Sequence, residues 1–409
     1  MNFNTALLHN NAFADEKTGA TLTPIYQSSA FSYQTAEELE KVFNHQLPGF
    51  SYSRINNPTV EAFEKRMTSL EGGLVSVACA SGMAAITNAI LNILKSGDEI
   101  ISSAGIFGGT IDLFSDLESF GIHTVYVKDG TSEEYEDKIT KKTKLIFAEV
   151  IGNPKLDVLD IQEVAKVAHR HQIPLFVDNT STTAFVIKPI ASGADIVINS
   201  STKYINGSGN SISGVITDSG KFKWDFSRYP GLQKYGKFGE FCFAAKLRNG
   251  LFRNTGACLS PFNAYLNLLG LETLGIRMER QCKNAFFLAQ FLKDNQGITE
   301  VNYPGLESSP DHGTAKRQFH GYYGAILTFR AGTKERAFKI MNQLKYAIIA
   351  ANIGDTKCLV IHPESTIYAN SNKEEKINAG VYDDLVRVSV GLEDIDDLIH
   401  DFEQAIALI

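Results

Sequence analysis

The sequence predicts an α/β protein with a mostly parallel sheet flanked by helices, followed by a smaller α+β region. Between residues 60 and 214, short apolar runs alternate with helical segments, which is typical of parallel strands joined by crossover helices. After Gly305, short strands are mixed with helices in a different pattern. The 409 residues, 44% of them hydrophobic and 21% charged, are enough for two or three domains with ordinary cores.

The chain begins with a polar stretch, residues 1–59, that is rich in Asn, Thr, Ser, Gln and Tyr. Only one helix is predicted in it, at residues 36–42. Because a segment this polar cannot form a hydrophobic core of its own, we expect it to be an arm that packs on a neighbouring subunit.

The alternating region follows. Its apolar runs predict strands at residues 74–80, 99–102, 124–127, 145–150, 174–177 and 195–198, and its helical patterns predict helices at 83–94, 109–120 and 161–171. Residues 221–251 are aromatic and glycine-rich without a clear period, and 255–292 return to a helical pattern. Strands are predicted at 323–329 and 386–390, with helices at 333–344 and 395–408. We therefore divide the chain into the arm, a domain of residues 60–257 and a C-terminal domain of residues 258–409.

Composition narrows the classes of function. The net charge of −7 contains no long run of one sign, which argues against nucleic acid or an anionic membrane as a partner. The five cysteines are scattered without a C-x-x-C pair, so we expect reduced thiols and no metal site. The first residues resemble no signal peptide, and no run of about 18 apolar residues occurs. A cytoplasmic protein that acts on small molecules is expected.

Lys203 is the first candidate catalytic residue. The strand at 195–198 leads into Ser200, Ser201, Thr202 and Lys203, and then into glycine-rich chain. A lysine can bind a cofactor aldehyde as an imine, and neighbouring hydroxyl groups suit a phosphate. Pyridoxal phosphate (PLP) offers both groups, whereas the plain alternative is a surface lysine in a polar turn.

Two other turns suit the same cofactor. Gly82 and Met83 follow a strand and begin a helix, where free N–H groups attract phosphate, although Ser81 could simply cap that helix. Asp178 ends a buried strand, where open α/β sheets gather ligands, and could keep a pyridine nitrogen protonated. The alternative is that Asp178 caps a turn.

Two aromatic segments are weaker candidates. Tyr52 and Arg54 are two residues apart, so extended chain would point both to the same side, where Arg54 suits a phosphate. Phe107 precedes two glycines and could lie flat on an aromatic cofactor, or could belong to the core.

Several of these stretches occur together and in order along nearly the whole chain: YSRINNPT, ASGMAAI, FGGT, VDNT, SSTKYINGSG and VRVSVGLEDIDDLI. With them the chain resembles the Cys/Met-metabolism family of PLP-dependent enzymes. The resemblance implies the type I fold of PLP-dependent transferases and a homotetramer built as a dimer of dimers.

The resemblance also implies roles for single residues. Lys203 would bind the cofactor covalently, Asp178 would pair with its ring nitrogen, and Phe107 would stack on the ring. The phosphate of the cofactor would be held by Ser200, Thr202, Gly82 and Met83, and a neighbouring subunit's phosphate by Tyr52 and Arg54. Asn153 would contact both cofactor and substrate. Arg387 and Asn352 would contact the substrate.

Smaller signs concern the reaction. Asn352 stands where many relatives have serine, and Gly109 stands where methionine γ-lyases often have cysteine. Residues 238–274 are similar to the sulfhydrylase version of the segment that links the domains. These signs favour methionine biosynthesis by γ-replacement, in which O-acetyl-L-homoserine and sulfide or a small thiol give L-homocysteine and acetate. The alternatives are methionine γ-lyase and cystathionine γ-synthase or γ-lyase activity. Phe107 replaces the family's usual tyrosine and removes a hydroxyl that could assist proton transfer.

Two readings from other classes compete. A dinucleotide-binding oxidoreductase would need G-x-G-x-x-G after the first strand, and ASGMAAI lacks it. A non-catalytic scaffold would not need Lys203, Asp178 and Arg387 together.

Overall fold

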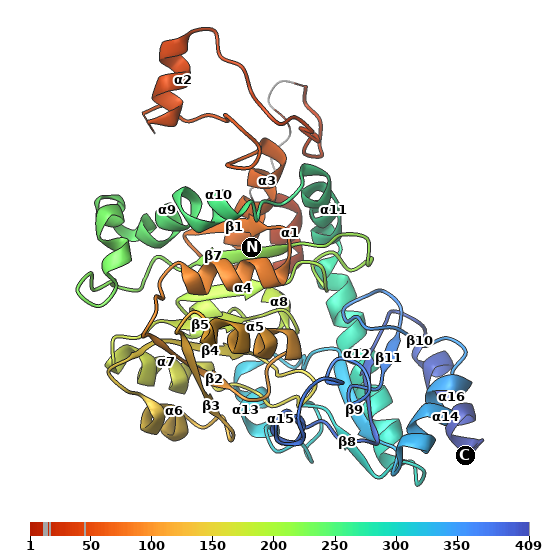
Figure 1. The fold of residues 1–409 in the computed structure, drawn as a ribbon. Coiled ribbons are helices and arrows are strands. Elements are labelled where there is room, and N and C mark those ends of the chain that lie inside the picture. The colour runs from red at the N-terminus through yellow and green to blue at the C-terminus, as the bar shows by residue number, and fades with distance from the viewer. Residues whose placement is uncertain (11–14, 16–17, 45, 409) are drawn as a thin grey trace.

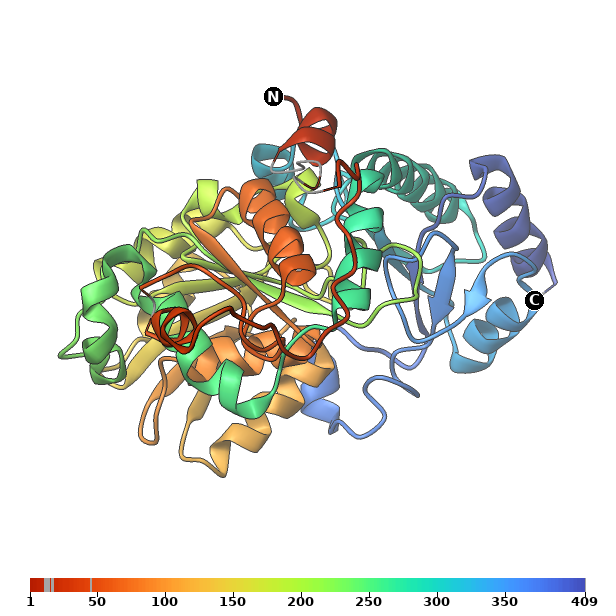
Figure 2. The same ribbon diagram turned by 90° about the horizontal axis from the view of Figure 1, so that it is seen from above.

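The computed structural model describes residues 1–10, 15, 18–44 and 46–408. Its dominant features are two sheets that lie side by side (Figures 1 and 2). The larger sheet contains β1 (Val75–Cys79), β2 (Glu99–Ser103), β3 (His123–Val127), β4 (Thr143–Glu149), β5 (Leu175–Asp178), β6 (Ile196–Asn199) and β7 (Gly214–Asp218). The smaller contains β8 (Glu300–Asn302), β9 (Ile326–Arg330), β10 (Ile348–Ile349), β11 (Leu359–Ile361) and β12 (Leu385–Ser389).

The larger sheet has the strand order β1-β7-β6-β5-β4-β2-β3. Neighbouring strands from β3 to β6 are parallel, while β7 runs antiparallel to both β6 and β1. The mostly parallel α/β sheet is thereby confirmed. We did not predict β7, because its five residues directly follow glycine-rich chain that carries no strand signal of its own.

Helices cover both faces of this sheet. They are α3 (Pro58–Glu71), α4 (Gly82–Leu91), α5 (Gly108–Glu118), α6 (Ser132–Lys138), α7 (Ile161–Arg170), α8 (Thr183–Val186), α9 (Cys242–Asn249) and α10 (Leu251–Thr255), with 3-10 turns at Pro189–Ser192 and Pro230–Phe241. In β4, Ile146 faces the core under α3 and α7, whereas Phe147 faces the core under α4, α5 and α9. A strand buried on both faces reads as one continuous apolar run, and this explains why β4 was predicted.

The arm has two helices, α1 (Phe3–His9) and α2 (Ala36–Phe43), so the prediction of one helix was incomplete. The short α1 packs on α11 (Pro261–Glu272) and α12 (Leu274–Asp294) of its own chain, whereas we expected the arm to pack on a neighbouring subunit. In contrast, α2 stands away from the two sheets (Figure 1) and exposes Leu39 and Phe43. Thr35 caps it by accepting a hydrogen bond from the Glu38 amide.

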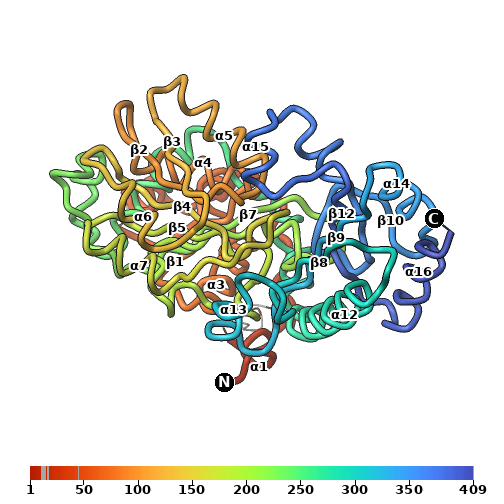
Figure 3. The backbone as a smooth tube through the Cα atoms, turned by 90° about the horizontal axis from the view of Figure 1, so that it is seen from below, coloured from red at the N-terminus to blue at the C-terminus, as the bar shows by residue number. Residues whose placement is uncertain are grey.

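Helices α11 (Pro261–Glu272) and α12 (Leu274–Asp294) lead from the larger sheet to the smaller one (Figure 1), and Figure 3 shows α12 beside the smaller sheet from below. The smaller sheet has the order β10-β11-β12-β9-β8. Together with α13 (His312–Gln318), α14 (Lys334–Gln343), α15 (Lys373–Asn378) and α16 (Ile395–Ala407) it forms the expected α+β region. Within the described ranges, no helix has both the length and the apolar character needed to cross a bilayer.

Candidate active site

A cavity of about 330 Å³ lies between the larger sheet and the C-terminal region. It collects residues from the carboxyl ends of β4, β5 and β6, from the start of α4 and from β12, as open α/β sheets do with their ligands. The predicted site residues that line it are Gly82, Met83, Phe107, Asn153, Asp178, Ser200, Thr202, Lys203, Asn352 and Arg387. The structure thus brings together ten residues drawn from positions 82 to 387.

Lys203 reaches the cavity from the turn after β6. Its Nζ donates a hydrogen bond to Asn352 Oδ1 at 2.6 Å. Burial, and then the positive charge of Arg387, lower the pKa of Lys203 to about 8. The amine is therefore more easily deprotonated than a surface lysine, which is what a nucleophile requires.

Arg387 is buried in the middle of β12, where it is 3% exposed. Its guanidinium donates to Asn153 Oδ1 at 2.9 Å and to the Asn352 carbonyl at 3.1 Å. Burial lowers its pKa to about 10, so it stays charged near neutral pH. Among the described residues no carboxylate forms an ion pair with it.

Asp178 ends β5 and is 9% exposed. It accepts the Thr180 amide at 2.8 Å, and Thr180 Oγ1 in turn accepts the Ser200 amide at 2.8 Å. This link fixes the end of β5 against the turn that carries Lys203. Burial raises the pKa of Asp178 to about 6.

The start of α4 provides a phosphate-sized cradle. Ser81 caps the helix by accepting the Ala84 amide at 3.0 Å, while the amides of Gly82 and Met83 have no acceptor among the described groups. A Cβ at Gly82 would lie 2.6 Å from Ser200 Cβ, so only glycine leaves this space open. Two free amides at a helix start, with Ser200 beside them, fit the phosphate of PLP.

Thr202 faces the same cradle with a hydroxyl that is already engaged. Its Oγ1 donates to the Ser213 carbonyl at 3.0 Å and accepts the Ser213 amide at 2.9 Å. Any contact with phosphate would have to replace or share the first of these bonds.

The extended chain predicted at Tyr52 and Arg54 was wrong, although their side chains do lie next to each other. The chain turns at 53–55, because the amides of Ile55 and Asn56 bond to the Tyr52 carbonyl, so the two residues do not alternate along extended chain. The Arg54 guanidinium lies 5.5 Å from the Tyr52 ring centre and donates to the Arg253 carbonyl at 2.7 Å. Neither residue lines this chain's cavity.

Our sequence reasoning missed Glu149 in this site. It ends β4, is directly paired with Asp178 in the sheet, and lines the same cavity. Its Oε1 accepts the Phe107 amide at 2.7 Å. The signal that pointed to Asp178, a carboxylate at the end of a buried strand, is also present at Glu149.

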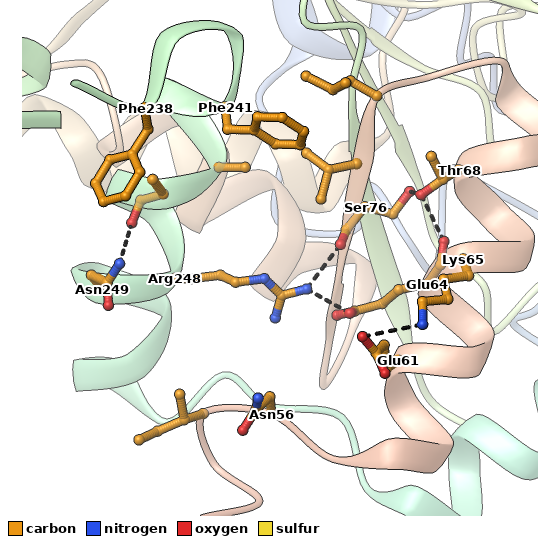
Figure 4. Close-up of a pocket in the computed structure, with 15 residues that line it drawn as sticks. Asn56, Glu61, Glu64, Lys65, Thr68, Ser76, Phe238, Phe241, Arg248 and Asn249 are labelled. Carbon is orange, nitrogen blue, oxygen red and sulfur yellow. Dashed lines mark hydrogen bonds and ion pairs between the residues drawn. The ribbon is translucent and has the colours of Figure 1, made fainter. Parts of the chain in front are cut away.

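A second hollow of about 690 Å³ lies between α3 and α9 (Figure 4). Its charged groups satisfy one another: Arg248 donates to Glu64 and to the Ser76 carbonyl, and Lys65 pairs with Glu61. It contains no residue predicted for the site. The described residues also include no cluster of His, Cys, Asp and Glu that could hold a metal ion.

Comparison with known proteins agrees with this geometry. The family described as Cys/Met metabolism PLP-dependent enzyme matches residues 4–407. An O-acetyl-L-homoserine sulfhydrylase of Corynebacterium glutamicum is 41% identical, over 100% of this chain and 97% of its own length. A homocysteine synthase of Schizosaccharomyces pombe is also 41% identical, over 99% of this chain and 98% of its own.

A solved structure is similar throughout. The crystal structure of a putative O-acetylhomoserine (thiol)-lyase from Campylobacter jejuni superposes with a TM-score of 0.94 and 34% identity, and each chain is covered completely. That protein contains N'-pyridoxyl-lysine-5'-monophosphate, a lysine joined to the cofactor.

Proposed function

We propose that this chain, which belongs to the Cys/Met-metabolism family of PLP-dependent enzymes, converts O-acetyl-L-homoserine and sulfide to L-homocysteine and acetate. The relatives named above support this choice, since two of the three are named for O-acetylhomoserine and the other for homocysteine.

The single observation that carries the proposal is the buried guanidinium of Arg387. A charge taken out of water is costly unless an opposite charge meets it, and none of the described residues supplies one. The carboxylate of an amino-acid substrate would provide that charge and could form two parallel hydrogen bonds. Asn153 and Asn352 hold the guanidinium in place by accepting its hydrogen bonds.

Lys203 is the proposed cofactor-bonding residue and proton carrier. Asn352 Oδ1 fixes its amine within the cavity, and the lowered pKa leaves part of it neutral at the pH of the cell. Once the substrate's amino group has displaced it, the free amine would remove a proton from the substrate's α-carbon and then one from its β-carbon as acetate leaves the γ-carbon. Hydrosulfide would then bond to the γ-carbon, and the amine would return protons to the β- and α-carbons.

The residues that would hold PLP are Lys203, Asp178, Phe107 and the cradle of Gly82, Met83, Ser200 and Thr202. When bound, PLP supplies an electron-accepting ring that stabilises negative charge at the substrate's α-carbon. Asp178 would keep the ring nitrogen protonated, and the Phe107 ring would lie on one face. Phe107 offers no hydroxyl to the leaving group, so we assign the proton steps to Lys203.

The test is a product assay of the purified protein. We expect sulfide-dependent homocysteine from O-acetyl-L-homoserine, little α-ketobutyrate from methionine, and loss of both turnover and the visible cofactor band in Lys203→Ala. Rapid α-ketobutyrate from methionine, without homocysteine from O-acetyl-L-homoserine, would instead support methionine γ-lyase activity.

We also propose a homotetramer made of two dimers in the cytoplasm. The exposed apolar residues Phe262, Leu269 and Ile276 on α11 and α12, together with those of α2, support burial against other copies of the chain. Five free cysteines suit a reducing compartment. The division at residues 59/60 and 257/258 remains a proposal, and the two separate sheets support its second boundary.

A further inference from the structure

Two carboxyl groups lie side by side at the carboxyl ends of β4 and β5. Glu149 and Asp178 are direct partners in the parallel ladder, and each is 9% exposed. Both line the cavity that holds Lys203 and Arg387. Within the described part of the chain, neither carboxyl group forms an ion pair with a basic side chain.

The two groups differ in what they contact. Asp178 accepts the amide of Thr180 in the turn that follows it. Glu149 instead reaches across to α5, where its Oε1 accepts the Phe107 amide at 2.7 Å. Phe107 is the residue directly before α5, and its own side chain gives that helix no cap. The Glu149 carboxyl is therefore the group that ties the Phe107 backbone to the sheet.

We propose that Glu149 is a positioning residue that stays protonated beside an ionised Asp178 and anchors the backbone of Phe107 at the edge of the cofactor site. This inference rests on the proposed pairing of Asp178 with the cofactor's ring nitrogen. Adjacent buried carboxyl groups do not both ionise, because each disfavours the other's charge. Asp178 must be the charged one if it is to hold a proton on the ring, and the shared proton then belongs to Glu149.

The groups around Glu149 favour this assignment. Besides Asp178 on β5, the carboxyl group of Asp157 in the following loop and the phenol of Tyr368 face it, and neither is a cation. Burial and then the charge of Asp178 raise the pKa of Glu149 well above its usual range, and the hydrogen bond from the Phe107 amide opposes this rise only in part. The cations of the cavity, Lys203 and Arg387, bond to Asn352 and Asn153 instead.

A neutral Glu149 has a consequence for the site. An amide acceptor can replace a protonated carboxyl group without changing the charge, so Glu149→Gln should keep both the Phe107 contact and the single charge of Asp178. Glu149→Ala removes the contact and leaves the Phe107 amide unpaired, at the cost of a buried donor. The two variants therefore separate charge from anchoring.

The first measurement is infrared difference spectroscopy of the holoenzyme at neutral pH. The carbonyl stretch of a protonated carboxyl group should be present in the parent and missing in Glu149→Gln. Glu163→Gln, a matched change at an exposed residue of α7, should leave that stretch unchanged. If Glu149→Gln removes an ionised carboxylate band instead, the proposal is wrong.

The second measurement is the dissociation constant of PLP from the apoenzyme. We expect Glu149→Gln to stay within about threefold of the parent and Glu149→Ala to weaken binding about tenfold, since one anchoring hydrogen bond is lost. Equal weakening in both variants would overturn the proposal. If Glu149→Ala does not fold, the Gln variant and its infrared spectrum decide the question alone.

Asp178→Asn distinguishes a failure of this inference from a failure of the proposed site. It should weaken PLP binding and shift the pH midpoint of the visible band, whatever the state of Glu149. If Asp178→Asn behaves like the parent while Glu149→Gln loses its protonated carboxyl band, the role given to Asp178 is wrong and that given to the Glu149 proton stands.

Discussion

Lys203 and Arg387 place two positive groups in one small cavity, and the charge of Arg387 acts on the amine of Lys203. Burial sets most of the lowered pKa of Lys203, and repulsion by Arg387 adds to it. Arg387 therefore has two roles. It can bind a substrate carboxylate, and its charge helps to make the neighbouring Lys203 amine neutral and reactive.

This coupling predicts a pH effect on the apoenzyme. Covalent binding of PLP needs the neutral amine, so its rate should rise with pH through about 8. In Arg387→Gln the repulsion is gone, the pKa of Lys203 rises, and the midpoint should move to higher pH. Stopped-flow absorbance measures both profiles, with Lys203→Ala as the control that forms no bond. A midpoint that stays or falls in Arg387→Gln would contradict the coupling.

Gly109 makes a second residue-scale prediction. A Cβ there would lie 2.7 Å from the Phe107 ring, closer than carbon atoms approach. Gly109→Ala should push the ring from its place beside the cavity and weaken PLP binding by about tenfold, while the fold, judged by circular dichroism, is kept. Gly313→Ala, in α13, is the matched control, because the nearest atom to its added Cβ is Arg317 Nη1 at 3.9 Å. Unchanged affinity in Gly109→Ala would show that the ring moves freely.

Single site residues could be predicted from the sequence where their neighbours along the chain indicate their role. Lys203 follows a strand and hydroxyl groups, and Asp178 ends an apolar run. The contact of Lys203 with Asn352 joins residues 149 positions apart, and no local pattern reports such a distance. Glu149 was within reach of sequence reasoning, because it is the second-last residue of the predicted strand at 145–150, and the next predicted strand along the chain leads to Asp178.

At the scale of elements, the parallel strands were predictable because each is a short, continuous apolar run between helices. The antiparallel β7 was missed because it directly follows glycine-rich chain, whereas β8, β10 and β11 have only two or three residues, too few to show a period. The turn at 53–55 was missed for a different reason. Its hydrogen bonds are made by backbone amides, and the side chains of Tyr52 and Arg54 give no indication of them in the sequence.

The joint between α3, β1 and α9 yields an element-scale prediction (Figure 4). Glu64 on α3 is buried, accepts the Ala78 amide at 2.8 Å and pairs with Arg248 on α9. Arg248→Met would leave this carboxylate without its cation and should lower the free energy of unfolding by about 3 kcal/mol. Urea unfolding measures the loss, and Glu64→Gln/Arg248→Met is the control that removes both charges and should be much less destabilised.

The same loss should depend on pH. Burial raises the pKa of Glu64 in the folded protein, and Arg248 opposes that rise. Without Arg248 the folded-state pKa lies still further above the unfolded one, so ionised Glu64 disfavours the fold increasingly as pH rises between the two values. The difference between Arg248→Met and the parent should therefore shrink toward acid pH. A pH-independent difference would mean that lost packing, not charge, explains the effect.

At the scale of the whole molecule, one chain does not bring all of its predicted site residues to its own cavity. Tyr52 and Arg54 lie outside the cavity of their own chain, and α2 stands away from the body with Leu39 and Phe43 exposed. The resemblance assigns Tyr52 and Arg54 to a neighbour's phosphate. If that is so, a dimer is the smallest active unit, and each site combines Lys203 of one copy with Arg54 of the other.

Mixing two inactive variants tests this arrangement. In a dimer of one Arg54→Ala chain and one Lys203→Ala chain, one site carries both defects and the other carries neither. Random exchange makes half of the dimers mixed, so activity should return to about one quarter of the parent's. Mass spectrometry of the intact assembly verifies that exchange has occurred. No gain after verified exchange would place Arg54 in its own chain's site, whereas full activity of Arg54→Ala alone would show that the residue is not needed.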